Sequence, residues 1–209
     1  MTSTDFLKRL CEGYVRSYRN LGIRGQAQSN IDPRLDSHGA DITHRELDFF
    51  AKLGEMLGFV SRLEAGRRDL SWFDADSKKL VLYMERETTS KKARSTMEKL
   101  LQSGKWKARY RVAVLGWVKP EDFTSVRRAI ASHLKNRSLV VLAWVGSEIY
   151  NATDLEVIVA SKGKVYTRQG KAEPDNEKYW YARFVDKGWR SAPGYLRGRL
   201  PSPQIKGAK

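Results

Sequence analysis

The stretch Lys79-Leu80-Val81-Leu82-Tyr83-Met84-Glu85-Arg86-Glu87-Thr88 carries the strongest fold signal in the sequence. Its apolar side chains follow one another without alternation from Leu80 to Met84, which predicts a strand buried on both faces. The apolar run ends at Glu85, so this carboxylate lies where the strand emerges at its carboxyl end. Glu87 is two residues further on and points to the same face of the strand. Open α/β sheets commonly bind ligands at that edge, so both acids are candidate functional residues.

A second predicted strand precedes this one in the chain. Arg67-Arg68-Asp69-Leu70-Ser71-Trp72-Phe73 is followed by the polar Asp74-Ala75-Asp76-Ser77-Lys78, which is typical of a hairpin turn. Such a hairpin brings Asp69 back to about the level of Glu85. Carboxylates that converge on a sheet edge are costly unless a cation lies between them, and Mg²⁺ or Mn²⁺ prefers oxygen ligands of this kind. The alternative interpretation is a salt bridge from Asp69 to an adjacent arginine, with Glu85 at a solvated strand end.

Helix and strand patterns surround this hairpin. Thr43-His44-Arg45-Glu46 matches a capping box and predicts a helix that runs to about Gly58. Glu46 has two possible roles there, because it can bond to the Thr43 amide or reach the sheet edge from the start of the buried stripe. The other predicted elements are helices at about 90–102 and 120–134 and strands at about 109–118 and 139–145. A βαβ unit is formed by the strand at about 109–118, the helix at about 120–134 and the strand at about 139–145. We therefore predict an α/β fold, flanked by helices, whose mixed sheet joins an antiparallel hairpin to a parallel pair.

These patterns divide the chain into four parts. They are a basic helix and loop at 1–42, an α/β core at 43–150, a β-rich extension at 151–200 and a disordered tail at 201–209. In the first part, apolar residues recur at helical spacing from Phe6 to Tyr18, which favours a helix packed on the domain over an arm that binds phosphate. In the extension, rings and positive charges alternate from Tyr179 to Arg190. Such a stretch either covers the main sheet or stacks the bases of a single strand.

The composition indicates the kind of partner. The 209 residues include 39 Lys and Arg against 24 Asp and Glu, a formal net charge of +15 that favours nucleic acid as the partner. The longest apolar run, Leu139 to Val145, is too short to span a membrane, and Met1 to Asp5 begins no signal peptide. The single cysteine, Cys11, indicates a reducing compartment, and the three histidines have no zinc-site spacing. We therefore expect a cytoplasmic protein without a membrane partner.

The order of these elements resembles the core of the PD-(D/E)XK nuclease superfamily. A helix bearing Glu46 is followed by a strand with Asp69, a hairpin, a strand that ends in acid-x-acid, and then helix–strand–helix–strand. The resemblance covers roughly Thr43 to Val145 and rests on order and spacing. Asp69 matches the Asp of the motif and Glu85 its (D/E), whereas Glu87 stands in place of the motif's Lys and Arg68 in place of its Pro.

The resemblance implies a restriction-endonuclease-like fold and metal-dependent hydrolysis of phosphodiester bonds, with DNA as the first expectation for the substrate. The implied catalytic residues are Asp69, Glu85, Glu87 and Glu46. The implied ligands of Mg²⁺ or Mn²⁺ are Asp69, Glu85 and the backbone carbonyl of Arg86. The candidate nucleic-acid contacts are Arg67, Arg68, Lys91, Lys92 and Arg94. For the last three, a solvated helix face is the alternative.

Two other functions fit the same residues. In the first, the protein keeps the nuclease-like fold and binds nucleic acid without catalysis, because Glu87 replaces the Lys. In the second, it is a basic RNA-binding or assembly factor whose acids form only surface salt bridges. A homodimer is a further expectation, since many enzymes with this kind of core dimerise to cut both strands.

Overall fold

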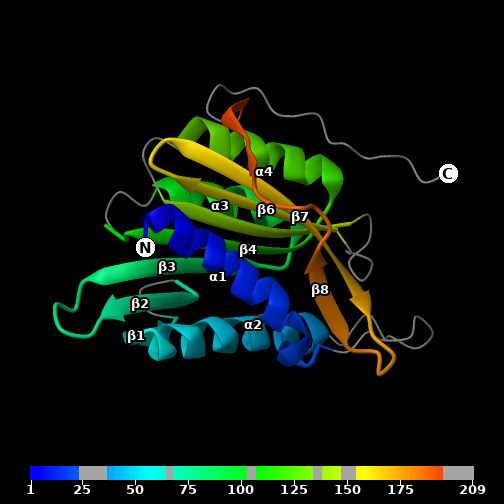
Figure 1. The fold of residues 1–209 in the computed structure, drawn as a ribbon, viewed down its shortest axis with the longest axis horizontal. Coiled ribbons are helices and arrows are strands. Elements are labelled where there is room, and N and C mark those ends of the chain that lie inside the picture. The colour runs from blue at the N-terminus through cyan, green and yellow to red at the C-terminus, as the bar shows by residue number, and fades with distance from the viewer. Residues whose placement is uncertain (24–36, 65–67, 103–106, 134–137, 147–153, 195–209) are drawn as a thin grey trace.

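A computed structural model describes residues 1–23, 37–64, 68–102, 107–133, 138–146 and 154–194. Within this part of the chain, nine strands form one mixed sheet in the order β1 to β8, with β9 paired to β7 (Figure 1). The helices span Ser3–Ser17 (α1), Ser37–Met56 (α2), Ser90–Gln102 (α3) and Pro120–His133 (α4), and a 3-10 helix, η1, spans Tyr18–Leu21. The strands span Phe59–Leu63 (β1), Leu70–Asp74 (β2), Leu80–Glu87 (β3), Tyr110–Val118 (β4), Leu139–Val145 (β5), Asp154–Ser161 (β6), Lys164–Pro174 (β7), Trp180–Phe184 (β8) and Arg190–Ser191 (β9).

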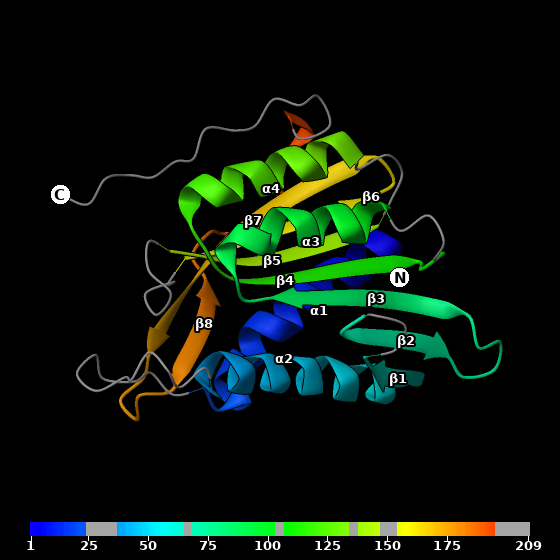
Figure 2. The ribbon, with the colours of Figure 1, turned by 180° about the vertical axis from the view of Figure 1, so that it is seen from behind.

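The pairing of the strands confirms the predicted mixed α/β sheet. Strands β1, β2 and β3 form an antiparallel meander, and β3, β4 and β5 are parallel neighbours. Helix α3 connects β3 to β4, and α4 connects β4 to β5, as parallel pairing requires. Strands β5 to β8 are antiparallel. Figure 2 shows α3 and α4 together on one face of the sheet, whereas α1 lies on the other face.

The sheet separates two hydrophobic cores. One core joins α1 and α2 to alternate residues of the strands, among them Trp72, Met84 and Val114. The other core joins α3 and α4 to the residues in between, among them Tyr83 and Ala113. Strands β3 to β5 are buried on both faces for this reason, as the unbroken apolar runs predict. None of the helices in the described ranges is long and apolar enough to cross a membrane.

Helix α2 and strand β1 differ from the sequence-based expectation. The helix begins at Ser37, so Thr43 lies inside it and the predicted capping box is wrong. Ile42 is buried along with Leu47 on the same helix, so the apolar stripe starts before the apparent cap. Strand β1 was not expected, because a five-residue edge strand of which three residues are exposed has little periodicity to detect.

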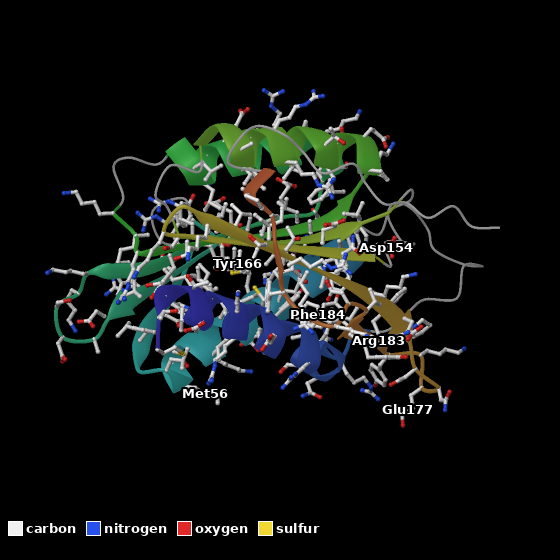
Figure 3. The ribbon with its side chains drawn as sticks, turned by 45° about the horizontal axis from the view of Figure 1, so that its top comes forward. Met56, Asp154, Tyr166, Glu177, Arg183 and Phe184 are labelled. Atoms are coloured by element: carbon white, nitrogen blue, oxygen red, sulfur yellow. The ribbon has the colours of Figure 1, made fainter. Side chains whose placement is uncertain are left out.

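The C-terminal strands extend the main sheet. Strand β6 pairs with β5, and β7 and β8 continue the order, so the predicted β-rich extension shares the sheet of the core. Trp180, Phe184 and Trp189 pack against the core on the side of α1, and Tyr166 and Phe184 lie beside that helix in Figure 3. Arg168 lies 3.8 Å above the centre of the Phe184 ring and also pairs with Glu12 of α1. These rings therefore cover the sheet, the first of the two roles considered for this stretch.

Helix α2 approaches the sheet closely at Gly54. A Cβ atom at this position would lie 2.5 Å from Trp72 Nε1 and 2.8 Å from Ser61 Oγ. Trp72 is held in this position because its Nε1 donates a hydrogen bond to the Phe50 carbonyl at 3.1 Å. Glycine is therefore required at the contact between α2, β1 and β2.

We expect Gly54→Ala to lower the free energy of unfolding by about 1–3 kcal/mol, because the added methyl group overpacks a buried contact. Helix propensity alone would favour alanine by about 1 kcal/mol, so the sign separates the two effects. Gly13→Ala in α1 is the matched control, since a Cβ there meets nothing within 4 Å and a small gain in stability is expected. Denaturant unfolding of both variants measures the difference, and equal gains would contradict the close approach.

Candidate functional site

Asp69 and Glu85 lie side by side at one edge of the sheet. Leu70 is the register partner of Met84, so Asp69, one residue before β2, lies opposite Glu85 on β3. Alternate positions face opposite sides, and Tyr83 belongs to the α3 core, so Glu85 and Asp69 also face α3. The negative charge of Asp69 is among the causes that raise the pKa of Glu85. The hairpin thus brings two carboxylates together on one face.

Glu85 is a buried carboxylate with two donors. Its residue is 4% exposed, and its Oε2 accepts from Lys99 Nζ at 2.7 Å. The Tyr83 hydroxyl, two residues earlier on the same face, donates to Oε1. Burial raises the pKa of Glu85 above its usual range, although the bonds from Lys99 and Tyr83 oppose that shift. The side chain is therefore a carboxylate that a second cation would stabilise.

Asp69 is held by the backbone of β3. Its Oδ2 accepts from the Arg86 amide at 2.6 Å, beyond the last ladder pair of β2 and β3. The amide and the carbonyl of one strand residue point to the same side, so the Arg86 carbonyl is on the β2 side of β3 as well. The Arg86 amide therefore fixes the position of the Asp69 carboxylate, and the Arg86 carbonyl lies on the same side of β3.

The Arg86 side chain passes to the other face of the sheet. Its Nε donates to Glu46 Oε2 at 2.7 Å, with both side chains at most 1% exposed. Tyr14 donates to the second oxygen of Glu46, and Trp144 Nε1 donates to the Tyr14 oxygen at 3.1 Å. A Cβ at Gly116 would lie 2.9 Å from Arg86 Nη1, an atom without a hydrogen-bond partner in the described part of the chain. Arg86 is thus clamped on the side of α1 and α2.

Glu46 and Glu87 do not join the two carboxylates, contrary to the expectation from sequence. Glu46 lies on the opposite face and is neutralised by Arg86. Glu87 accepts from the Thr89 amide at 2.7 Å and from the Thr96 hydroxyl at 3.3 Å. Its carboxylate therefore fixes the start of α3, where the helix dipole favours a negative charge.

The donor set at this edge is two carboxylates with a backbone carbonyl. Over the described ranges, no three or more His, Cys, Asp or Glu side chains gather in a way that could hold a metal ion. Asp69 and Glu85 nevertheless fit Mg²⁺, which proteins usually bind through one or two carboxylates while it keeps waters that substrate phosphates replace. The Arg86 carbonyl adds a third hard oxygen.

The candidate nucleic-acid contacts lie in different environments. Lys91 and Lys92 are exposed in the first turn of α3, and Arg94 pairs with Glu98 at 2.8 Å on the same helix. Arg68 is 4% exposed, with its guanidinium 5.4 Å from the centre of the Tyr83 ring, so it is part of the packing beneath Glu85. Arg67 lies outside the described residues.

Two residues of this site, Tyr83 and Lys99, were not predicted from the sequence. Tyr83 stands two residues before Glu85, and the period of a strand places it on the same face, so its signal was present. Lys99 lies 14 positions after Glu85, and its contact depends on how α3 rotates over β3. No local pattern indicates that rotation.

Known protein families, curated proteins and solved structures were compared with the chain, and none matched it.

We expect Glu46→Ala to lower the free energy of unfolding by about 3–5 kcal/mol, because it leaves Arg86 buried without a counter-charge. The melting temperature falls by about 10 °C for a chain of this size. Asp48→Ala, on the exposed side of α2, breaks a surface pair with Lys52 and serves as the control with little change. Thermal denaturation compares the variants, and equal melting temperatures would contradict the clamp.

We expect Glu85→Gln to raise the melting temperature at neutral pH. A carboxyl whose pKa is raised by folding contributes stability below its ordinary value of 4.5 and loses it as the pH rises through the raised value. The charged Glu85 therefore lowers the stability of the wild type at neutral pH, and the gap in melting temperature between the wild type and Glu85→Gln closes in acid. Lys99 tolerates the loss because its side chain is half exposed. Thermal denaturation over about pH 4–8 measures the gap. Glu98→Gln, on the helix that carries Lys99, is the control. A gap that is independent of pH would rule out the cause given.

Proposed function

We propose that the protein is a metal-dependent nuclease that hydrolyses phosphodiester bonds in nucleic acid, with DNA as the first substrate to test. The observation that carries this proposal is the pairing of Asp69 and Glu85 at the ends of neighbouring strands, on one face and beside the amide of Arg86. The net charge of +15 favours a polyanionic substrate at such a site.

The order of the elements supports a restriction-endonuclease-like fold. Helix α2 precedes the antiparallel β1, β2 and β3, and α3, β4, α4 and β5 follow in parallel connections. This is the order on which the sequence resemblance rests, with one added edge strand. Asp69 at the start of β2 and Glu85 near the end of β3 occupy the two acidic positions of that resemblance.

The residues of the site have distinct roles under this proposal. Asp69, Glu85 and the Arg86 carbonyl hold Mg²⁺ or Mn²⁺, which would lower the pKa of an attacking water and offset charge at the phosphorus. Tyr83 fixes the orientation of Glu85 through its hydroxyl. Lys99 supplies the positive charge that Glu87 does not, and its half-exposed ammonium can pass from Glu85 to a phosphate oxygen.

A second candidate function is nucleic-acid binding without catalysis. The observation in its favour is that Lys99 already neutralises Glu85 at 2.7 Å, while Glu87 stands at the position where the resemblance has a lysine. In this case the carboxylates serve the structure and the basic surface binds the ligand. The same assay distinguishes the two functions.

We expect the purified chain to cleave labelled DNA with Mg²⁺ or Mn²⁺, in a comparison of single- and double-stranded DNA and RNA. Asp69→Asn removes a carboxylate that would hold the metal, and Lys99→Met removes a positive charge near the phosphate, so each reduces the rate by about 100-fold or more. Glu55→Gln, on the exposed side of α2, is the control with unchanged rate.

Cleavage that survives in Asp69→Asn would refute the assignment of the site. Tight binding with no cleavage under either metal would favour the second candidate function. The absence of any binding would remove nucleic acid as the partner.

A further inference from the structure

In the described part of the chain, α3 does not pack over the face of β1 and β2 next to Asp69, which we call the open face. Helix α3 packs on β3 and β4, whereas α2 packs on β1 and β2 from the opposite face. Figure 2 shows β3 and β2 emerging beyond α3 on this side. Ser61 donates to the Ala51 carbonyl of α2, so its neighbours Val60 and Arg62 face the other way, toward the same side as Asp69.

An aromatic ring and an arginine lie together on this open face. Phe73 is the register partner of Val60 and is only partly buried, and Val60 is 38% exposed. The Arg62 guanidinium is 5.1 Å from the centre of the Phe73 ring and is exposed to solvent. Neither Phe73 nor Val60 belongs to the two cores that the described residues form. A partly exposed phenylalanine ring beside an exposed arginine offers a surface on which a base can stack.

Positive charges of α3 lie at and beyond the two carboxylates to which this surface leads. Lys99 reaches Glu85, so its side of the helix faces the open strands. Lys92 is seven residues earlier, on the same side of the helix and exposed to solvent. Because Thr96 contacts Glu87 and Lys99 contacts Glu85, α3 runs back along β3, and Lys92 lies on the far side of the carboxylates from Phe73. Phe73 is four residues from Asp69 along β2, a distance of about 13 Å. Along the direction of β3, the order is therefore Phe73, then the two carboxylates with Lys99, then Lys92.

We propose that Val60, Arg62 and Phe73 form a track for a single nucleic-acid strand that leads to Asp69 and Glu85, with Lys99 at the carboxylates and Lys92 beyond them. This inference rests on the proposed function and assigns its substrate class. An unpaired base stacks on Phe73, and Arg62 swings from the ring to a phosphate. A duplex presents its backbone and base edges, so it has no base face to offer the ring. The positive charges of Arg62, Lys99 and Lys92 are complementary to the charge of the strand and select against a basic protein partner.

Fluorescence anisotropy without divalent metal, so that binding is separated from cleavage, tests the track with a labelled single strand and the matched duplex. Phe73→Ala weakens single-strand binding by about 10-fold, within the range measured for one stacked base. Phe73→Trp keeps the affinity, which separates stacking from folding. Arg62→Ala weakens binding and lowers its dependence on salt by about one phosphate contact. Leu63→Ala is the control, because Leu63 is 54% exposed on the same strand but faces the other side.

Wild-type affinity that favours the single strand, with the losses above, supports the track. Wild-type affinity that favours the duplex overturns it, as does unchanged single-strand binding in Phe73→Ala and Arg62→Ala. If these two variants match the wild type while cleavage still depends on Asp69, only the track is refuted and the proposed function stands. If the wild type binds neither nucleic acid, both proposals are refuted.

Discussion

The buried ion pair between Arg86 and Glu46 is the constraint on which the rest of the structure depends. Removing either charge from water is costly, so each requires the other in a fixed geometry, with Tyr14 on the remaining oxygen of Glu46. Because side chains alternate along a strand, clamping Arg86 toward α1 and α2 commits Glu85 to the α3 face. The amide of the same residue holds Asp69. One arginine thereby sets the positions of both carboxylates.

The unequal cover of the sheet decides where those carboxylates meet solvent. Helices α3 and α4 bury the central strands on one face, while in the described part of the chain α2 packs on β1 and β2 from the other face. Asp69 and Glu85 lie at this border, where burial raises the pKa of Glu85 while open strands lead toward it. Such a border suits a site that excludes water from its carboxylates and is still accessible to a polymer. It also explains why Phe73 is only partly buried although most large apolar side chains are buried.

The candidate site was only partly predictable. The approach of Asp69 to Glu85 followed from the hairpin, because two strands and a short turn leave few registers. Glu87 has the same spacing signal as Glu85, but its carboxylate bonds to Thr89 and Thr96 at the start of α3. Glu46 and Lys99 lie on helices, and the strand residue that each meets depends on helix rotation and packing.

The sequence by itself determined the buried strands, the parallel crossover and the place of two acids at a strand end. Each follows from the local periodicity of apolar and polar residues, which extends over only a few neighbouring positions. Only the tertiary structure decided that α2 starts at Ser37, that Arg68 is buried and that Lys99 neutralises Glu85. These depend on which surfaces meet across the sheet. The contacts across the sheet that lower the free energy join residues far apart in the chain, so no short sequence pattern predicts them.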